Sequence, residues 1–191
     1  MINRFSPSAC LIRITAWAAA ALSCAGIACG AEAQTDGLSN SAEYITGFVH
    51  YVHWQGEDRL PAWTVCIVGD VPVEQDRVYA GRIVRGKPFA IHRIDAEAAL
   101  NNCQVLDLSA ADAATTDKLL ARVRRQPILA VGSGSGFCTA GGQICLHLGG
   151  APAAEQQKFE VNISAMREAA LVVSSRLLTL GSSRTAGKDT P

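Results

Sequence analysis

The sequence lacks the features that mark several large classes of protein. Its 17 Lys and Arg residues balance its 17 Asp and Glu residues, and no basic stripe is present, so nucleic-acid binding has little support. It also lacks a C-x-x-C pair and a Gly-Lys-Ser/Thr sequence. These absences argue against a thioredoxin-like catalyst, covalent haem attachment and a P-loop nucleotide site.

Recognisable catalytic and metal-binding patterns are also missing. The acidic residues are scattered, with no pair suited to acid–base catalysis and no nucleophile–base signature. His50 and His53 lie three residues apart and could share a metal ion, but no third ligand is evident beside them. His92 and His147 have no partner motif. We therefore expect a protein that is not an enzyme and that has no metal or other cofactor.

The first 33 residues have the pattern of an export signal. Arg4 and Arg13 accompany an apolar stretch that is short for a membrane span. The Ala-Glu-Ala sequence at residues 31–33 fits the small-x-small cleavage rule, so the mature chain is expected to begin near Gln34. A retained membrane anchor is the alternative. No later segment is long and apolar enough to cross a membrane.

Cleavage of this leader would reduce the seven cysteines to four. Three lie in the leader, namely Cys10, Cys24 and Cys29, and the others are Cys66, Cys103, Cys138 and Cys145. An even number of cysteines in an exported protein predicts two disulfides, for which three pairings are possible. Reduced core thiols and a metal site are alternatives, although the spacing lacks the close pairs of a zinc site. A lipoprotein anchored at Cys24 or Cys29 is a further alternative, with poor lipobox residues before each.

Hydrophobic periodicity predicts alternating helices and strands in the 158 residues that remain when the leader of 33 is removed from 191. The clearest helix, residues 41–54, carries apolar residues at the helical spacing: Ile45, Phe48, Val49 and Val52. Further helices are expected at 73–80, 95–101, 111–125, 164–170 and 174–180, the last capped by Ser174 or Ser175. Strands are expected at 63–68, 89–94, 103–108, 127–131, 143–148 and 158–163.

This alternation predicts a single α/β domain over residues 41–180. We expect a single-layer, mostly parallel sheet flanked by helices, to which the last two strands add an antiparallel edge hairpin. The small, polar segments 34–40 and 181–191 are expected to be flexible. The glycine-rich segment 132–142 invites comparison with a nucleotide-binding loop. No helix is expected directly after its glycines, so a flexible hairpin loop is favoured.

Four segments, taken in order, carry a resemblance to a known family. They are the helix with Phe48, Tyr51 and Trp54 followed by Cys66–Asp70; Gly86–Phe89 running to Cys103–Leu106; Pro127–Gly132 with Gly136-Phe137 and Gly141–Ile144; and Phe159–Ile163 continued by Ser174–Leu178. The set resembles the YfiR-like family of small periplasmic proteins over about residues 42–180. The chain departs from the family at Ser133, where Asp is frequent, and in a longer loop at residues 149–157.

The resemblance implies a periplasmic negative regulator, often a homodimer. Such a protein binds the periplasmic sensor domain of an inner-membrane diguanylate cyclase and inhibits it, which lowers cyclic di-GMP and biofilm formation. In the family, the cyclase can be released from inhibition when an outer-membrane lipoprotein captures the regulator. The expected contact region is the late hairpin and the residues after it, including Ile144, Phe159, Glu160 and Met166. The alternative is a periplasmic small-ligand-binding module whose pocket the glycine-rich segment would border.

The resemblance also favours one of the three cysteine pairings, Cys66–Cys103 with Cys138–Cys145. The same pairing agrees with the expected elements, because Cys66 and Cys103 lie in strands that can be neighbours and the other two flank a short glycine-rich turn. We expect the longer loop to give the more stabilising bridge. A reducing environment would then release the partner by opening the bridges, particularly an exposed Cys138–Cys145.

Overall fold

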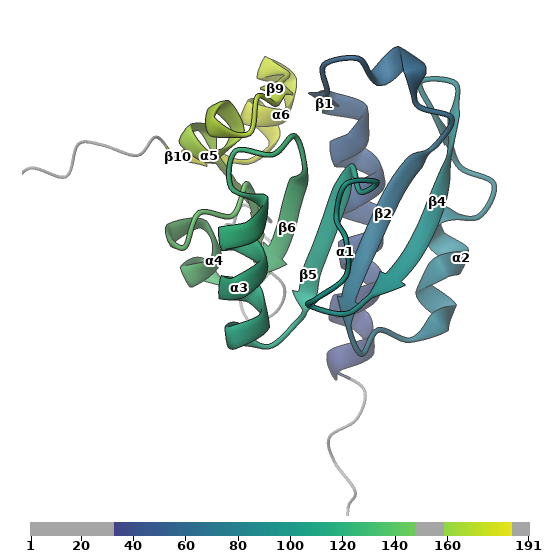
Figure 1. Cartoon of the computed structure of the whole chain (residues 1–191), viewed down its shortest axis with the longest axis vertical. Helices are drawn as coiled ribbons and strands as arrows, with labels where there is room; N and C mark the ends of the chain where they lie inside the picture. Colours follow the sequence, from purple (N-terminus) through teal and green to yellow (C-terminus); the bar gives the residue numbers. More distant parts are fainter. Residues whose placement is uncertain (1–32, 148–158, 185–191) are drawn as a thin grey trace, which may run out of the picture. The chain divides into compact units, whose positions relative to one another are not determined.

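The computed structural model describes residues 33–147 and 159–184 (Figure 1). The predicted leader up to residue 32, with its three cysteines, and the loop 149–157 lie outside the described residues. Within the described ranges, no helix is both long enough and apolar enough to span a membrane.

Helices and strands alternate along the described chain. The helices are α1 (Ala33–Tyr51), α2 (Asp76–Tyr79), α3 (Ala113–Val123), α4 (Ser135–Thr139), α5 (Ile163–Glu168) and α6 (Ser175–Leu180), with the 3-10 turns η1 (Glu57–Arg59) and η2 (Val73–Gln75). The strands are β1 (Val52–His53), β2 (Trp63–Gly69), β3 (Ile83–Val84), β4 (Lys87–Ile94), β5 (Val105–Ala110), β6 (Leu129–Ser133), β7 (Ile144–Leu146), β8 (Phe159–Asn162), β9 (Val172–Val173) and β10 (Ser182–Arg184).

The larger sheet confirms the predicted α/β class. Its strand order is β10-β8-β7-β6-β5-β2-β4-β3, and neighbouring strands are parallel except for the pairs β7–β8 and β3–β4. The antiparallel pair expected late in the chain is β7–β8, although β10 adds one more parallel strand outside it. A separate antiparallel pair joins β1 to β9.

Helix α1 covers one face of the sheet, as Figure 1 shows behind β5 and β2. Its predicted apolar stripe is buried, and Ile45, Phe48 and Val49 pack in one cluster with Val65 and Ile67 of β2. The registers of β2 with β4 and β5 extend this face, because Val65 pairs with Ile91 and Val105. Hydrophobic side chains from several strands therefore line this face, and α1 buries them, as expected for a parallel sheet that is covered on its faces.

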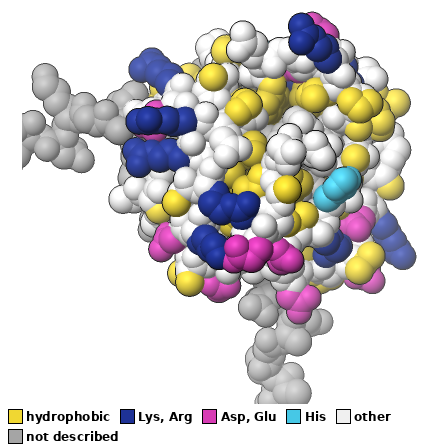
Figure 2. All heavy atoms as spheres, viewed as in Figure 1, with side chains coloured by type: hydrophobic (Ala, Val, Ile, Leu, Met, Phe, Trp, Pro, Cys, Tyr) yellow, Lys and Arg dark blue, Asp and Glu magenta, His cyan; other side chains and the backbone are white. Residues whose placement is uncertain are grey.

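Helix α3 covers the opposite face. The alternate residues of β2 and β5, Cys66, Val68 and Leu106, pack there in a second cluster with Leu119 and Leu120 of α3. The period-two alternation of side chains along each strand therefore separates the two clusters. On the face shown in Figure 2, acidic and basic side chains are interspersed, in keeping with the balanced charge of the sequence.

Side-chain caps fix the beginnings of three helices. The Asp112 carboxylate accepts a hydrogen bond from the Thr115 N–H at 2.9 Å and begins α3. The Asn162 side chain caps α5 in the same way. Ser174, one of the two predicted caps, accepts from the Arg176 N–H at the start of α6. Each cap satisfies a backbone donor that the first turn of a helix leaves free.

Several predicted boundaries are wrong. Residues 95–101 form turns instead of a helix, because Arg122 of α3 donates hydrogen bonds to the Ala96 and Ala98 carbonyls and holds them apart from a helical ladder. Helix α1 begins at Ala33, so its backbone includes residues 34–40, which the sequence leaves outside the domain. The expected flexible tail contributes β10, which pairs with β8.

Candidate functional site

Two disulfides join elements on the α3 face of the sheet. Cys66 of β2 is bonded to Cys103, which precedes β5, and Cys138 of α4 is bonded to Cys145 of β7. In each pair the Cα atoms lie 5.7 Å apart, a separation that is ordinary for a disulfide. These are the two pairs expected from the sequence, and all four residues belong to the hydrophobic cluster covered by α3.

The expectation of an exposed Cys138–Cys145 bridge is wrong. Cys138 is 2% exposed and Cys145 is fully buried. The cause is α4, which folds residues 135–139 into a short helix where the sequence suggested a flexible hairpin loop. A reductant in solution therefore has little access to this bridge in the folded structure.

The glycines around α4 make room for Phe137. A Cβ atom added to Gly132 or to Gly142 would overlap the Phe137 ring. Phe137 is buried in the cluster that also holds Cys138 and Cys145. Close packing of backbone against an aromatic ring therefore explains Gly132 and Gly142, whereas Gly134 and Gly141 have positive φ angles, which favour glycine.

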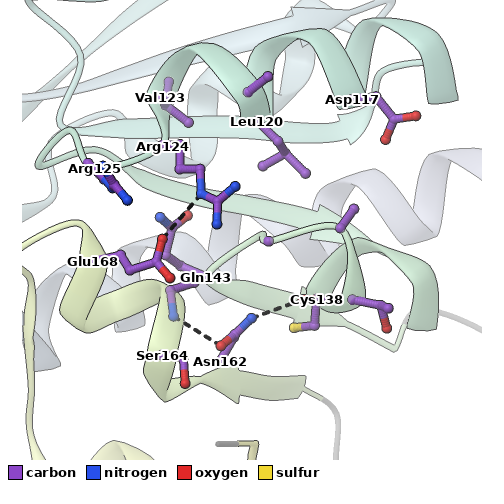
Figure 3. A pocket seen from close by; sticks show the side chains of 15 residues that line it. Asp117, Leu120, Val123, Arg124, Arg125, Cys138, Gln143, Asn162, Ser164 and Glu168 are labelled. Carbon is purple, nitrogen blue, oxygen red and sulfur yellow. Dashed lines mark hydrogen bonds and ion pairs between the residues drawn. The ribbon is translucent and has the colours of Figure 1, made fainter. Parts of the chain in front are cut away.

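A cavity of about 560 Å³ lies beside the Cys138–Cys145 bridge (Figure 3). Its walls are the end of α3, the end of α4 with residues 139–141, and α5. The Arg124 side chain points across it, and its Nε atom lies 3.2 Å from a carboxylate oxygen of Glu168. Arg125 lies at the same end, and Asp117 lies at the other. The volume falls in the range of small-molecule sites.

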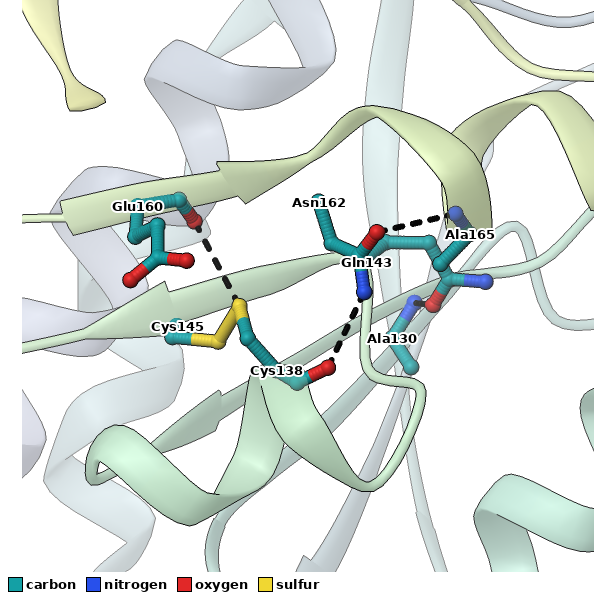
Figure 4. Close-up of a disulfide and its surroundings, with 7 residues drawn as sticks. All are labelled: Ala130, Cys138, Gln143, Cys145, Glu160, Asn162 and Ala165. Atoms are coloured by element: carbon teal, nitrogen blue, oxygen red, sulfur yellow. Dashed lines mark hydrogen bonds between the residues drawn. A yellow bond between two sulfur atoms is a disulfide. The ribbon is translucent and has the colours of Figure 1, made fainter. Parts of the chain in front are cut away.

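Two buried amide side chains hold the wall of this cavity in place (Figure 4). The Asn162 Nδ2 donates to the Cys138 carbonyl at 2.9 Å, and its Oδ1 accepts from the Ala165 N–H at 3.0 Å. Gln143 Oε1 accepts from the Ala130 N–H at 3.0 Å. Because unmade hydrogen bonds are costly in the interior, the Asn162 contacts fix α4 and α5 relative to each other, and the Gln143 contact holds the residue before β7 against β6.

The four residues expected to contact a partner do not form a surface. Ile144 and Met166 are 0% and 1% exposed, and Phe159 is 6% exposed and packs edge to face on Phe48. Glu160 is half-buried. The strands β7 and β8 that carry three of them are internal to the sheet, so alternate side chains on them enter the core. The expected contact set is therefore corrected: three of its members are core residues.

The histidines do not meet. His50, His53, His92 and His147 are all exposed, and His53 Nδ1 lies 3.5 Å from the Glu57 carboxylate. In the described part of the chain, no group of three or more His, Cys, Asp or Glu side chains is arranged to hold a metal ion.

Arg85 forms a cluster that the sequence did not reveal. Its guanidinium donates to the Val49 and His50 carbonyls at the end of α1, and it lies 3.0 Å from the Glu57 carboxylate. The same group stacks 4.6 Å from the centre of the Trp63 ring. Arg85 lies in the turn between β3 and β4, and its single side chain thus connects α1, η1 and β2. No spacing in the sequence links these distant positions.

Glu57 has a lowered pKa in this cluster. Partial burial raises the pKa of its carboxyl. The hydrogen bond from the Trp54 N–H, the charge of Arg85 and the contact with His53 together lower the pKa by more than burial raises it. The net shift favours the carboxylate, so the Arg85–Glu57 pair persists at neutral pH.

Asp107 is a buried acid on β5. It accepts hydrogen bonds from the Ser41 hydroxyl at 3.1 Å and the Ser109 N–H at 3.0 Å. Burial raises the pKa of its carboxyl above the ordinary value, against the effect of these hydrogen bonds. Burial, followed by the charge of Asp107, also raises the pKa of Tyr79. The signal in the sequence is a lone Asp within an apolar strand run, which is too common to mark a site.

Comparison with known proteins covers the same part of the chain. Residues 39–182 match the model of a family described as YfiR/HmsC-like. The match extends from α1 to the first residue of β10 and so includes both disulfides and the cavity. No curated protein matches the sequence.

Proposed function

The chain belongs to the YfiR/HmsC-like family, and on this basis we propose that it is a periplasmic negative regulator and not an enzyme. It binds the periplasmic sensor domain of an inner-membrane diguanylate cyclase and holds that enzyme inactive. Cyclic di-GMP and biofilm formation then stay low. The observation that carries the proposal is the family match over residues 39–182, which includes nearly every described element.

Inhibition works as a binding equilibrium. The regulator binds the inactive conformation of the sensor domain more tightly than the active one, so its presence shifts the cyclase population toward the inactive state. To move the population from 99% active to 99% inactive, the affinities must differ by about 10⁴-fold. Capture of the regulator by an outer-membrane lipoprotein would remove it from this equilibrium and release the cyclase.

Export to the periplasm is part of the proposal. The leader of residues 1–33 would be cleaved near Gln34. Since α1 begins at Ala33, this cleavage would leave the helix almost complete. Two disulfides are in keeping with an oxidising compartment. N-terminal sequencing of protein from the periplasmic fraction should return the sequence that begins at or near Gln34.

The partner surface must differ from the buried set of Ile144, Phe159 and Met166. We place it after the late hairpin, at β9, where Val172 is 65% exposed. An exposed apolar side chain contributes little to the core of the fold, and it gains burial when a partner covers it. Val73 on the α2 side is equally exposed, at 66%, and offers a matched control.

Co-purification with the periplasmic domain of the cognate cyclase tests this placement. The wild-type protein and Val73→Glu should retain the domain, whereas Val172→Glu should lose it while keeping the wild-type circular dichroism spectrum. Loss of binding in both variants, or in neither, would remove β9 as the contact. Failure of the wild-type protein to retain the domain would count against the function itself.

Homodimerisation and redox release complete the proposal. We propose that the regulator is a dimer in solution, which light scattering of the purified protein would test.

We also propose that reduction of its disulfides weakens its binding to the partner. Because Cys138 and Cys145 are buried, this release would be slow and governed by the opening of α4.

A further inference from the structure

We propose that the cavity beside the Cys138–Cys145 bridge binds a small anion that carries a carboxylate or a phosphate group. This goes beyond the proposed regulation of a cyclase, which needs only a protein partner. The cavity is about 560 Å³ in volume and lies between the ends of α3 and α4 and helix α5. Arg124 and Arg125 both line it at one end (Figure 3).

Arg125 is the residue that points most directly to a ligand. It comes just after the end of α3 with a φ of 65°, a left-handed conformation in which glycine or asparagine is usual. The described residues make no hydrogen bond or ion pair with its guanidinium. Arg125 is exposed at the rim of the cavity, so its guanidinium is accessible to an anion, and strained backbone conformations are concentrated at ligand sites.

Arg124 provides a second cation that can be shared with a ligand. It pairs with Glu168 at 3.2 Å, but the two side chains are 70% and 44% exposed. An ion pair that open to solvent contributes little to stability, so a bound carboxylate or phosphate can accept from both arginines with a small loss. Asp117 lies at the far end of the cavity and would disfavour an anionic group there, which orients the ligand with its charge toward Arg125.

The remaining walls are suited to a small organic body. Leu120 and Val123 of α3 and Ala165 of α5 contribute apolar surface, and Gln143 and Asn162 are held by their own hydrogen bonds. A preformed wall lowers the ordering cost of binding. The site therefore accepts a ligand with one anionic group and a short apolar or polar stem.

The ligand and the disulfide share a wall. Cys138 and residues 139–141 line the cavity, and Cys138 is bonded to Cys145. Reduction by a dithiol, such as dithiothreitol, transfers two electrons and two protons to the bridge, giving two cysteine thiols and the cyclic oxidised dithiol. Opening of α4 would remove this part of the wall, so a bound anion favours the closed form and lowers the population of the open form, from which the bridge is reduced.

Thermal unfolding with two probes tests the site. Inorganic phosphate and succinate are titrated separately against the wild-type protein, with sodium chloride at matched ionic strength as the reference. A saturable rise in the melting temperature with either probe is expected, and the probe that acts identifies the group recognised. Arg125→Gly should raise the dissociation constant about tenfold or more, since a charge-assisted hydrogen bond is lost.

The variants make the outcome decisive. Arg125→Gly relieves the left-handed strain, so its melting temperature without probe should equal or exceed that of the wild type, and lost binding cannot be ascribed to unfolding. Arg176→Ala removes an exposed cation outside the cavity and should bind as the wild type does. Absence of a saturable response to both probes, or equal binding by Arg125→Gly, would overturn the proposal. So would an unchanged rate of reduction by dithiothreitol at saturating probe.

Discussion

At the scale of single residues, Arg85 connects more of the fold than any sequence feature suggests. It caps α1, pairs with Glu57 and stacks on Trp63. Arg85→Ala should lower the free energy of unfolding by about 2–3 kcal/mol, because the Glu57 carboxylate would be left partly buried without its charge partner. Urea unfolding at pH 7 would measure this.

The matched variant Arg85→Lys separates charge from geometry. Lysine keeps the charge near Glu57 but cannot make the forked contacts to the α1 carbonyls or stack as a planar group. It should recover only part of the stability lost in Arg85→Ala. Full recovery by lysine would show that the charge alone matters, against a role for the contacts with the α1 carbonyls and Trp63.

The buried Asp107 should make the free energy of unfolding depend on pH in an unusual direction. The pKa of its carboxyl is raised above the unfolded value of 3.8, so the folded state binds the proton more tightly than the unfolded state. Its contribution is favourable below the unfolded pKa and is lost as pH rises through the folded pKa. The fall in unfolding free energy approaches about 1.4 kcal/mol per pH unit while only the folded state holds the proton.

The variant Asp107→Asn removes this titration and keeps the shape of the side chain. Its unfolding free energy, measured in urea between pH 4 and pH 8, should fall less with rising pH than that of the wild type. Its amide can still accept from the Ser109 N–H and donate to the Ser41 hydroxyl. Parallel pH profiles for the two proteins would contradict the raised pKa.

At the scale of elements, the packing of α4 against the sheet through Phe137 depends on glycine. Gly142→Ala should lower the unfolding free energy by about 1–3 kcal/mol, since its Cβ would overlap the ring. Gly47→Ala is the control, because nothing lies within 4 Å of a Cβ at that position in α1; it should raise stability by up to about 1 kcal/mol.

A second change identifies the cause of the loss. In Phe137→Leu, the smaller side chain leaves space beside Gly142, so adding Gly142→Ala to it should cost less than the same change in the wild type. Such a departure from additivity is expected for residues in contact. Strict additivity in thermal or urea unfolding would show that Gly142 matters for another reason.

The elements also show what a sequence can and cannot reveal. The apolar stripe of α1 and the buried strand β2 are predictable from periodicity, because these patterns report which face is buried. The helix expected at 95–101 fails because side chains from α3, distant in sequence, hold that segment as turns. Strands β1, β3 and β9 contain two residues each, too few to leave a periodic pattern.

The candidate site was predictable only in part. The cysteine pairs can be inferred from parity, expected strands and the family resemblance. The burial of Cys138–Cys145 cannot, because α4 occupies a glycine-rich segment whose composition favours a loop. Ile144, Phe159 and Met166 belong to the predicted contact region, the late hairpin and the residues after it. The internal strands β7 and β8 place Ile144 and Phe159 in the core, and Met166 of α5 is buried as well.

At the scale of the whole molecule, the two disulfides should differ in importance. In the loop-entropy model, the Cys66–Cys103 bridge, with a separation of 37, contributes about 4 kcal/mol, and the Cys138–Cys145 bridge, with a separation of 7, about 2.4 kcal/mol. Cys66→Ala/Cys103→Ala should therefore lower the unfolding midpoint more than Cys138→Ala/Cys145→Ala. The reverse order would show that local packing at α4 outweighs the chain entropy.

The chain belongs to the YfiR/HmsC-like family, and its mostly parallel sheet carries two buried disulfides. The central claim is that it restrains a diguanylate cyclase. The most direct measurement is cellular cyclic di-GMP in a strain from which the gene has been deleted. The level should rise on deletion and return when the full-length gene is restored, but not when a gene lacking the codons for residues 2–33 is supplied. An unchanged level on deletion would contradict this role.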